Sequence, residues 1–207
     1  MLRLPKSTEM SKQLPKKAIY TKFQMNTAAK DKIDADISRI TIVNEITADK
    51  VNIPAGENVQ SFFVLLVTLK RRNFDEKNIA MLSKLIPQNI LFILEYEDSC
   101  KLAIYHTKLM QTQWWPADQY SIELKGIDLD KVWENIVAQI GGITIVDNNT
   151  LDEQIQLDES RQKLEKEIAK LEKLARAEKQ PRKKFELVQQ LRKLEFELRR
   201  IASGKNN

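Results

Sequence analysis

The 207-residue sequence has few of the residues that most often carry enzyme chemistry. It contains one cysteine, Cys100, which excludes an internal disulfide and disfavours a zinc site built from this chain alone. It contains one histidine, His106, with no Gly-x-Ser-x-Gly elbow of a serine hydrolase beside it. With five glycines in all, it has neither of the glycine-rich loops that hold nucleotide phosphates. These motifs therefore predict no catalytic residue, no metal and no cofactor.

Long apolar runs are also missing. The longest, 62–67, has six residues, whereas a membrane-spanning helix needs about 20. The start of the chain lacks an apolar stretch of signal-peptide length, and the single cysteine suits a reducing compartment. We therefore expect a cytoplasmic protein with no membrane contact. The net charge of +5 is mild, but it permits an anionic partner.

The composition changes near residue 148. All tryptophans and tyrosines lie before this point, and Leu, Lys, Glu, Arg and Gln dominate after it. The turn-prone residues 147–150 separate the two regions, as is typical of a globular domain followed by long helices. We predict four parts: a basic N-terminal arm over 1–23, a globular domain over 24–147, a helical hairpin over 151–202 and a disordered tail over 203–207.

Periodicity predicts an α+β fold for the globular domain, with a mostly antiparallel sheet and flanking helices. In the segment 39–46, Ile40, Ile42 and Asn44 alternate with Thr41, Val43 and Glu45. Caps are expected at Asn26 or Thr27 and at Asp75, and stops at Pro87 and Gly141-Gly142. The expected helices are 27–37, 75–86 and 128–140, and the expected strands are 39–46, 59–70, 89–96, 101–107, about 112–115 and 121–124.

The most specific repeat lies at the end of the chain. Apolar residues step by four, three, four and three, as in a coiled-coil seam. Upstream, leucines recur at intervals of seven residues. Pro181 lies between these two apolar repeats and predicts a helix break near 179–181. The sequence thus predicts an antiparallel coiled-coil helical hairpin, and homodimerisation through the seam is a second expectation. The seam residues are Leu157, Leu164, Ile168, Leu171 and Ala175 in the first helix and Leu187, Leu191, Leu194, Leu198 and Ile201 in the second.

Positive charge gathers where the hairpin should turn. Between Lys170 and Lys184 there are seven bases and two acids, 7 minus 2 or +5. Such a run is often a solvated coiled-coil flank. It also suits contacts with the phosphates of DNA or RNA, which position a nucleic acid without reading its sequence. The candidate contacts in this run are Arg176, Lys179, Arg182, Lys183 and Lys184.

A second group of candidate contacts lies in the first 115 residues. Neighbouring strand residues face opposite ways, so one member of the Trp114-Trp115 pair can lie in the core while the other is exposed, although core packing or edge covering by both is the more common arrangement. An exposed aromatic ring can stack on a base or fill a pocket of a partner. The candidate contacts in this group are Lys16, Lys17, Lys70, Arg71, Arg72, Trp114 and Trp115.

A metal-dependent nuclease is a less favoured alternative. The expected order of helix, two strands, helix and strand is similar to that of restriction-endonuclease-like folds, whose chemistry needs acids for a metal and a lysine for the attacking water. Glu45 and Lys70 are the candidates, but Thr68 stands where the pattern has an acid. The active set is therefore incomplete.

Several segments together resemble one family: Leu4 to Glu9, Pro15-Lys16-Lys17, Leu69-Lys70, Ile86-Pro87 before 90–94, and Gln180 to Lys184. The family is an uncharacterised bacterial one, sometimes mislabelled as methyl-accepting chemotaxis proteins. Its members are encoded beside helicases and DNA methyltransferases of restriction-like, phage-defence loci. The resemblance implies an accessory module that docks on a helicase or methyltransferase, and it brings no catalytic residues. Direct, sequence-independent nucleic-acid binding through the hairpin turn and the N-terminal arm is the alternative.

Overall fold

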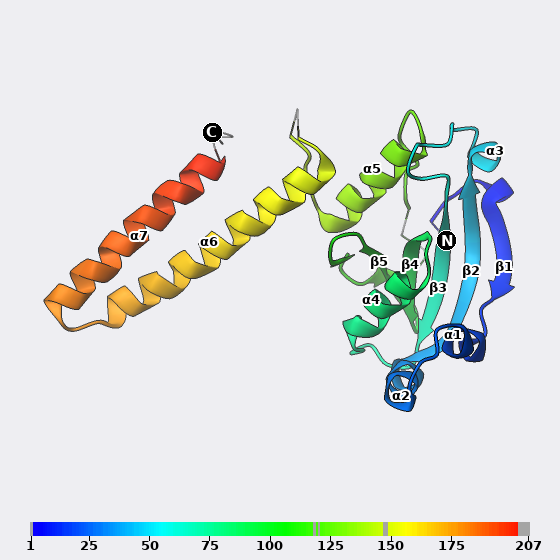
Figure 1. Ribbon diagram of the computed structural model, residues 1–207, viewed down its shortest axis with the longest axis horizontal. Helices are drawn as coiled ribbons and strands as arrows, with labels where there is room; N and C mark the ends of the chain where they lie inside the picture. Colours follow the sequence, from blue (N-terminus) through cyan, green and yellow to red (C-terminus); the bar gives the residue numbers. More distant parts are fainter. Residues whose placement is uncertain (1, 118, 120, 147–148, 203–207) are drawn as a thin grey trace. The chain divides into compact units, whose positions relative to one another are not determined.

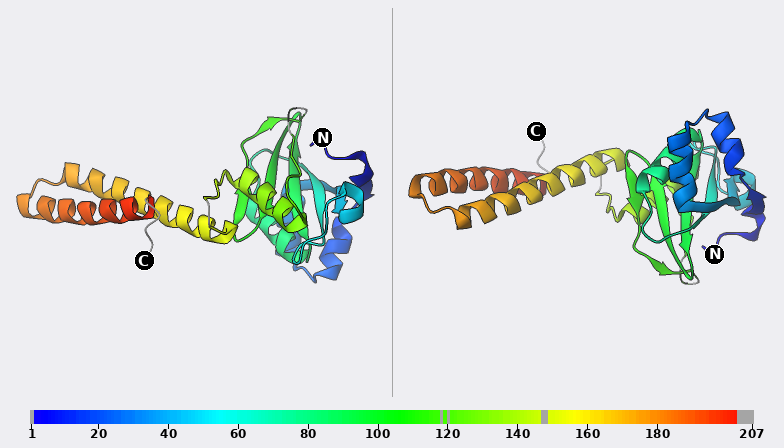
Figure 2. Two further views of the ribbon diagram at one scale, coloured as in Figure 1. Left: turned by 90° about the horizontal axis from the view of Figure 1, so that it is seen from above. Right: turned by 90° about the horizontal axis from the view of Figure 1, so that it is seen from below.

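A computed structural model describes residues 2–117, 119, 121–146 and 149–202. The chain forms two compact units, residues 1–143 (unit 1) and 144–207 (unit 2). Figure 1 labels their helices and strands, and Figure 2 shows two further views.

Unit 1 is built around one mixed sheet. Among the described residues the strand order is β1-β2-β3-β4-β5-β6, and β7 pairs with β5. Neighbouring strands are antiparallel except β3 and β4, which α4 connects as a crossover helix. A mixed α+β fold with a mostly antiparallel sheet, as predicted, is confirmed. The strands are β1 (Glu9–Gln13), β2 (Ile37–Thr47), β3 (Ser61–Leu69), β4 (Asn89–Tyr96), β5 (Ser99–Tyr105), β6 (Leu109–Gln111) and β7 (Trp115–Pro116), and the helices are η1 (Lys6–Thr8), α1 (Lys16–Lys22), α2 (Thr27–Asp36), α3 (Ala48–Val51), α4 (Glu76–Leu85) and α5 (Leu129–Gly141).

Local sequence chemistry sets the main helix ends. The side chains of Asn26, Asp75 and Asp128 accept hydrogen bonds from backbone N–H groups in the first turns of α2, α4 and α5. At the end of α5, Gly142 adopts φ +62°, a left-handed conformation that glycine tolerates best. The predicted caps at Asn26 and Asp75 and the predicted stop at Gly141-Gly142 are confirmed.

Helices cover both faces of the sheet. On one face, Leu65, Val67 and Phe92 join a buried cluster with residues of α1, α2 and α4. On the other face, α5 packs against the strands, and the rings of Phe62 and Trp133 lie 5.2 Å apart between centroids. Because β3 and β4 are covered on both sides, they read as nearly continuous apolar runs in the sequence.

The N-terminal segment differs from the predicted arm. β1 pairs with β2, and α1 places Ile19 and Tyr20 in the buried cluster. Residues 1–23 therefore belong to unit 1. The many polar residues of this segment obscured the two α1 side chains that are buried in the cluster.

A bulge changes the predicted alternation in β2. The register shifts between Ile42 and Asn44, so Ile40, Ile42 and Glu45 oppose Val67, Leu65 and Phe63 on one face. Asn44 instead shares the other face with Ile46, where its amide donates to the Thr8 hydroxyl at 2.9 Å. The predicted grouping of Asn44 with Ile40 and Ile42 is wrong, since one extra residue moves every later side chain to the opposite face.

Two short strands also differ from prediction. One continuous strand was expected at 112–115. Instead, β6 ends just before this region and the two-residue β7 begins at its last residue. Residues 121–124 were expected to form a strand, but they form none. The Ile122 N–H nevertheless donates to the Leu2 carbonyl at 3.2 Å. Pro116 limits pairing in this region, because it cannot donate to a ladder.

The loop before β3 is held by α5. The Asp130 carboxylate accepts hydrogen bonds from the backbone N–H groups of Glu57, Asn58 and Val59 at 2.6–3.2 Å. Burial alone would raise the pKa of Asp130, but these backbone donors outweigh it and keep the pKa below the usual value. A Cβ at Gly56 would lie 2.3 Å from this carboxyl group, so the close approach requires glycine.

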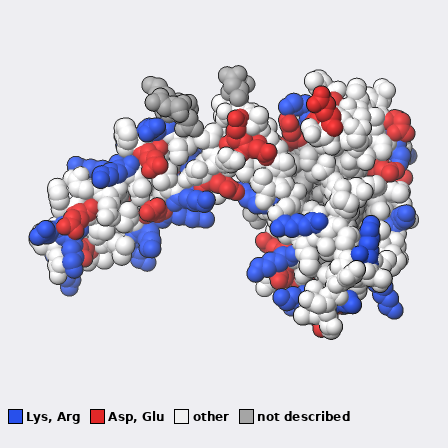
Figure 3. Space-filling view, in the orientation of Figure 1, with Lys and Arg blue, Asp and Glu red and all other residues white. Residues whose placement is uncertain are grey.

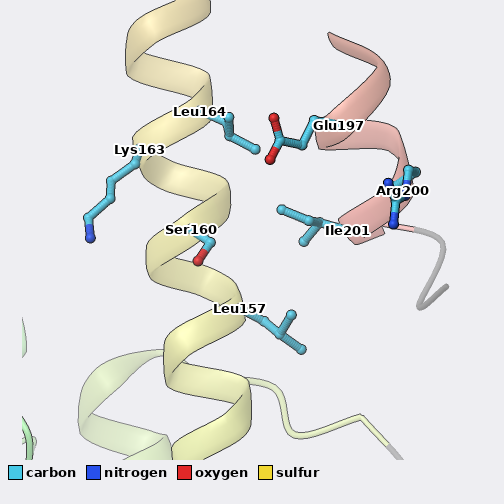
Figure 4. A pocket seen from close by; sticks show the side chains of 7 residues that line it. All are labelled: Leu157, Ser160, Lys163, Leu164, Glu197, Arg200 and Ile201. Atoms are coloured by element: carbon cyan, nitrogen blue, oxygen red, sulfur yellow. The ribbon is translucent and has the colours of Figure 1, made fainter. Parts of the chain in front are cut away.

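Unit 2 contains two long helices, α6 (Leu151–Ala177) and α7 (Pro181–Ala202), which pack against each other. Thr150 and Glu153 form a capping box at the start of α6. The chain leaves the helix at Glu178 and re-enters at Pro181, so the predicted break is confirmed. At the open end, Leu157 and Leu164 of α6 point toward Ile201 of α7 (Figure 4). Knobs-into-holes geometry stays a prediction, and the predicted tail 203–207 lies outside the described residues.

Candidate nucleic-acid and partner interface

The turn of unit 2 gathers the predicted basic residues. Pro181 occupies the first position of α7, and the Gln180 N–H donates to the Glu178 carboxylate at 2.8 Å. These contacts fix a three-residue connection between the basic ends of two helices. All five candidate bases around it are exposed: Arg176, Lys179, Arg182, Lys183 and Lys184. We call this set the hairpin tip, and Figure 3 shows Lys and Arg side chains at this end of the helices.

Few acids neutralise the hairpin tip. Arg176 lies 3.4 Å from Glu172 and Arg182 lies 3.5 Å from Glu186, one helical turn away in each case. The Arg182 side chain is 93% exposed, and exposed pairs of this kind contribute little to stability. Within the described part of the chain, Lys179, Lys183 and Lys184 take part in no ion pair. The tip therefore presents positive charge that an anionic ligand can use.

Two residues on α7 were not among the predicted contacts. Phe185 and Phe196 are 63% and 66% exposed, although phenylalanine is usually buried. They are eleven positions apart, which is close to three helical turns, so both rings lie on one line of the helix. That line is opposite the predicted seam. The signal was present in the sequence as two aromatic residues outside the four-three repeat.

Four of the five candidate bases of unit 1 contact other residues of the unit. Lys16 and Tyr20 donate to the Asp34 carboxylate, and the Lys70 ammonium donates to the Asp34 carbonyl at 2.5 Å. The hydrogen bond from Lys16 is the main cause that keeps the pKa of Asp34 below its usual value. Burial, followed by the bond to Asp34, raises the pKa of Tyr20. Lys16 and Lys70 are thus brought together, but around an acid of the same unit. Lys17 is exposed on α1.

Arg71 and Arg72 are engaged as well. Arg71 pairs at 2.5 Å with Asp36, a carboxylate that is only 1% exposed. The Arg72 guanidinium lies 5.4 Å from the centre of the Trp114 ring. Both arginines therefore contact residues of unit 1, and Arg71 helps to position the end of α2 against the loop after β3.

The two tryptophans differ in their exposure. Trp115 is 48% exposed, whereas Trp114 is half-buried. The Lys101 ammonium also lies 5.4 Å from the Trp114 ring and 5.0 Å from the Phe74 ring. Burial lowers the pKa of Lys101, and Glu76 at 3.9 Å partly opposes this. Cations already contact the Trp114 ring, so it is a structural element rather than an open stacking platform.

An apolar groove lies beside α1. It has a volume of about 280 Å³, and nine of its eleven lining residues are apolar. Phe63 and Ile42 form part of its floor on neighbouring strands, and Ala18 of α1 is exposed at its side. We call it the α1 groove. Its lining residues are Leu14, Ala18, Ile19, Lys22, Phe23, Ile42, Phe63, Leu65, Ile86, Gln88 and Ile90.

A family model described as "Domain of unknown function (DUF4391)" matches residues 2–198. The chain belongs to this family. The match spans both units, so the DUF4391 domain comprises the sheet and the helical hairpin together. No curated protein and no solved structure matches the chain.

In this DUF4391 chain the candidate nuclease residues are separated. Thr47 opposes Ser61 and Ile37 opposes Leu69, so Glu45 and Lys70 lie toward opposite ends of the β2–β3 pair. Glu45 instead pairs with Lys50 at 2.5 Å. Thr68, at the position where the pattern has an acid, donates to Glu95 on β4 at 3.2 Å. The combination of Glu45 with Lys70 therefore forms no joint site.

Other reactive side chains are placed in the sheet. Cys100 is buried on β5, and burial raises the pKa of its thiol. His106 follows β5, and its backbone N–H donates to the Lys108 carbonyl at 3.1 Å. In the described ranges, no three of the His, Cys, Asp and Glu residues are grouped so as to hold a metal ion. Within the same ranges no helix combines the length and apolarity needed to cross a membrane.

Proposed function

We propose that this chain is a non-catalytic accessory module of a bacterial DNA-processing or phage-defence system. In this proposal unit 1 docks on a helicase or DNA methyltransferase, and the basic hairpin of unit 2 either grips that partner or lies along the nucleic acid. The partner class comes from the resemblance of the sequence motifs. The α1 groove carries the docking proposal, because apolar side chains of three neighbouring strands line it and two of them, Ile42 and Phe63, are only half-buried.

The α1 groove suits a protein occupant. Its floor is apolar and its volume matches one or two apolar side chains rather than a large cofactor. Lys22 is the one charged lining residue, and it can pair with an acid beside the inserted side chain. We therefore propose that an apolar segment of the partner, flanked by an acid, inserts into the groove.

A substitution at the side of the groove tests this docking. Ala18→Arg adds a large charged side chain beside the groove without altering the buried cluster, so co-purification of a co-expressed helicase or methyltransferase should fall at least tenfold. Thr21→Arg adds the same side chain to an exposed position of α1 that does not line the groove. It is the matched control and should leave co-purification unchanged. Equal recovery with both variants would contradict docking at the α1 groove.

Direct nucleic-acid binding is the second candidate function. The observation that favours it is the exposure of the hairpin tip, where three lysines have no ion pair among the described residues. Contacts of this kind release counterions from the phosphates, so affinity should fall as salt increases. They carry no base information, and binding should be independent of sequence.

Charge reversal at the hairpin tip tests this function. With Arg182, Lys183 and Lys184 all changed to Glu, binding of labelled DNA and RNA, measured by fluorescence anisotropy, should be lost at low salt. In any residual duplex binding, the plot of log affinity against log salt should flatten by about three units. A triple reversal of Lys32, Arg39 and Lys77 is the control, because it makes the same charge change at exposed positions of unit 1. Equal loss in both variants would show a net-charge effect only and contradict contact by the tip.

A further inference from the structure

The outer face of α7, defined by Arg182, Phe185, Arg192, Lys193, Phe196 and Arg199, combines bare aromatic rings with bases. All six residues are exposed. At 100° per residue, the four bases lie within about 70° of the line that joins Phe185 and Phe196. The three acids of α7, Glu186, Glu195 and Glu197, lie about 90° or more from that line. The outer face therefore has positive charge and aromatic surface, and an acid reaches it only at the exposed pair of Arg182 with Glu186.

This face is free of the contact between α6 and α7. Leu187, Leu191 and Leu194 are half-buried, and they lie on the opposite side of the helix from the two phenylalanines. The helix thus has a second apolar feature that its packing on α6 does not use. The two rings are about 16 Å apart along the helix axis, so they form two separate platforms rather than one patch.

The spacing of the two rings and the charge around them distinguish between possible ligands of the outer face. A second copy of α7 would place like charges opposite each other, which is unfavourable. A membrane surface or a partner groove needs apolar residues repeated at every turn, but Gln189 and Arg192 lie on the line between the rings. Single-stranded nucleic acid needs spaced aromatic rings for its bases and cations for its phosphates. In a duplex the base faces are already stacked and cannot reach the rings.

We propose that the outer face of α7 binds single-stranded nucleic acid, with bases stacked on Phe185 and Phe196 and phosphates held by Arg182, Arg192 and Arg199. This proposal rests on the second candidate function and deepens it. The hairpin tip supplies charge for any nucleic acid, whereas the two rings give a preference for unpaired bases. An accessory module beside a helicase would then hold the strand that strand separation exposes.

The test compares an oligothymidine of about 15 nucleotides with a duplex of the same length, using fluorescence anisotropy. Phe185→Leu and Phe196→Leu remove the rings but keep apolar side chains of good helix propensity. Each should weaken oligothymidine binding about tenfold, and together about 100-fold, while duplex binding is unchanged. Val188→Leu is the matched control, and circular dichroism checks that each variant stays helical.

Three results would overturn the proposal, and they separate it from the function on which it rests. If the double variant binds oligothymidine as the wild type does, and the tip reversal abolishes binding, the tip alone makes the contact. If oligothymidine and duplex binding fall equally, the rings do not stack on bases. If wild-type protein binds neither probe at low salt, the proposal of nucleic-acid binding is wrong altogether. In that case, loss of a bound partner protein on Phe185→Leu would show that the outer face binds protein instead.

Discussion

Asp36→Ala should strongly destabilise unit 1. The Asp36 carboxylate accepts hydrogen bonds from the Arg71 side chain at 2.5 Å and from the Asn78 amide and the Asp75 N–H at 2.8 Å. Alanine would leave the buried Asn78 amide short of an acceptor and the arginine without its partner. Removing one partner from such a buried network costs about 3–5 kcal/mol. We expect the melting temperature of unit 1 to fall by about 10 °C or more.

The large effect follows because Asp36 joins three separate parts of the chain. It ends α2, its carbonyl accepts from the Lys70 N–H at 2.8 Å, and its side chain holds the first turn of α4. Asp36→Asn keeps the shape of the side chain but removes its charge, so it should lower the stability of unit 1 less than Asp36→Ala does. Asp31→Ala removes an exposed acid of the same helix and should change stability by no more than about 0.5 kcal/mol. If Asp36→Ala has the same melting temperature as the wild type, the hydrogen-bond network around Asp36 does not stabilise unit 1.

Leu191→Asp should unfold the hairpin of unit 2. Leu191 lies in the middle of the α7 seam, half-buried on the side of α7 opposite Phe185 and Phe196. A buried unpaired carboxylate costs several kcal/mol, which is on the order of the packing energy of the pair. Once separated, each helix is marginal in water, because most helical stability in proteins comes from packing. We expect most of the α6 and α7 signal at 222 nm to disappear.

Gln190→Asp is the matched control for the seam. It introduces the same residue one position earlier, at an exposed site, and should keep the helical signal. All three tryptophans lie in unit 1, so their fluorescence should be the same in both variants. Full helicity in Leu191→Asp would show that Leu191 is not part of the α6–α7 contact. Loss of the tryptophan signal would show that the substitution unfolds more than the hairpin.

Elements with local causes could be predicted from the sequence alone. Pro181 cannot continue a helix and suits the start of a new one, so the break could be placed to within three residues. Asp75 and Asn26 cap helices because their carboxylate and amide oxygens reach N–H groups two or three residues away. The strands expected at 59–70 and 89–96 correspond to β3 and β4. The exposed bases of the hairpin tip followed from the same local pattern.

Features that depend on distant residues required the tertiary structure. The bulge in β2, the pairing of β1 and the separation of Glu45 from Lys70 depend on strand register, which no local signal sets. Lys16, Lys70, Arg71 and Arg72 looked like available bases, but acids, a backbone carbonyl or a tryptophan elsewhere in unit 1 contact them. The α1 groove needs side chains from α1 and three strands. The exposure of Phe185 and Phe196 became visible only once the other side of α7 was packed on α6, because a helix face is free or covered according to what packs against it.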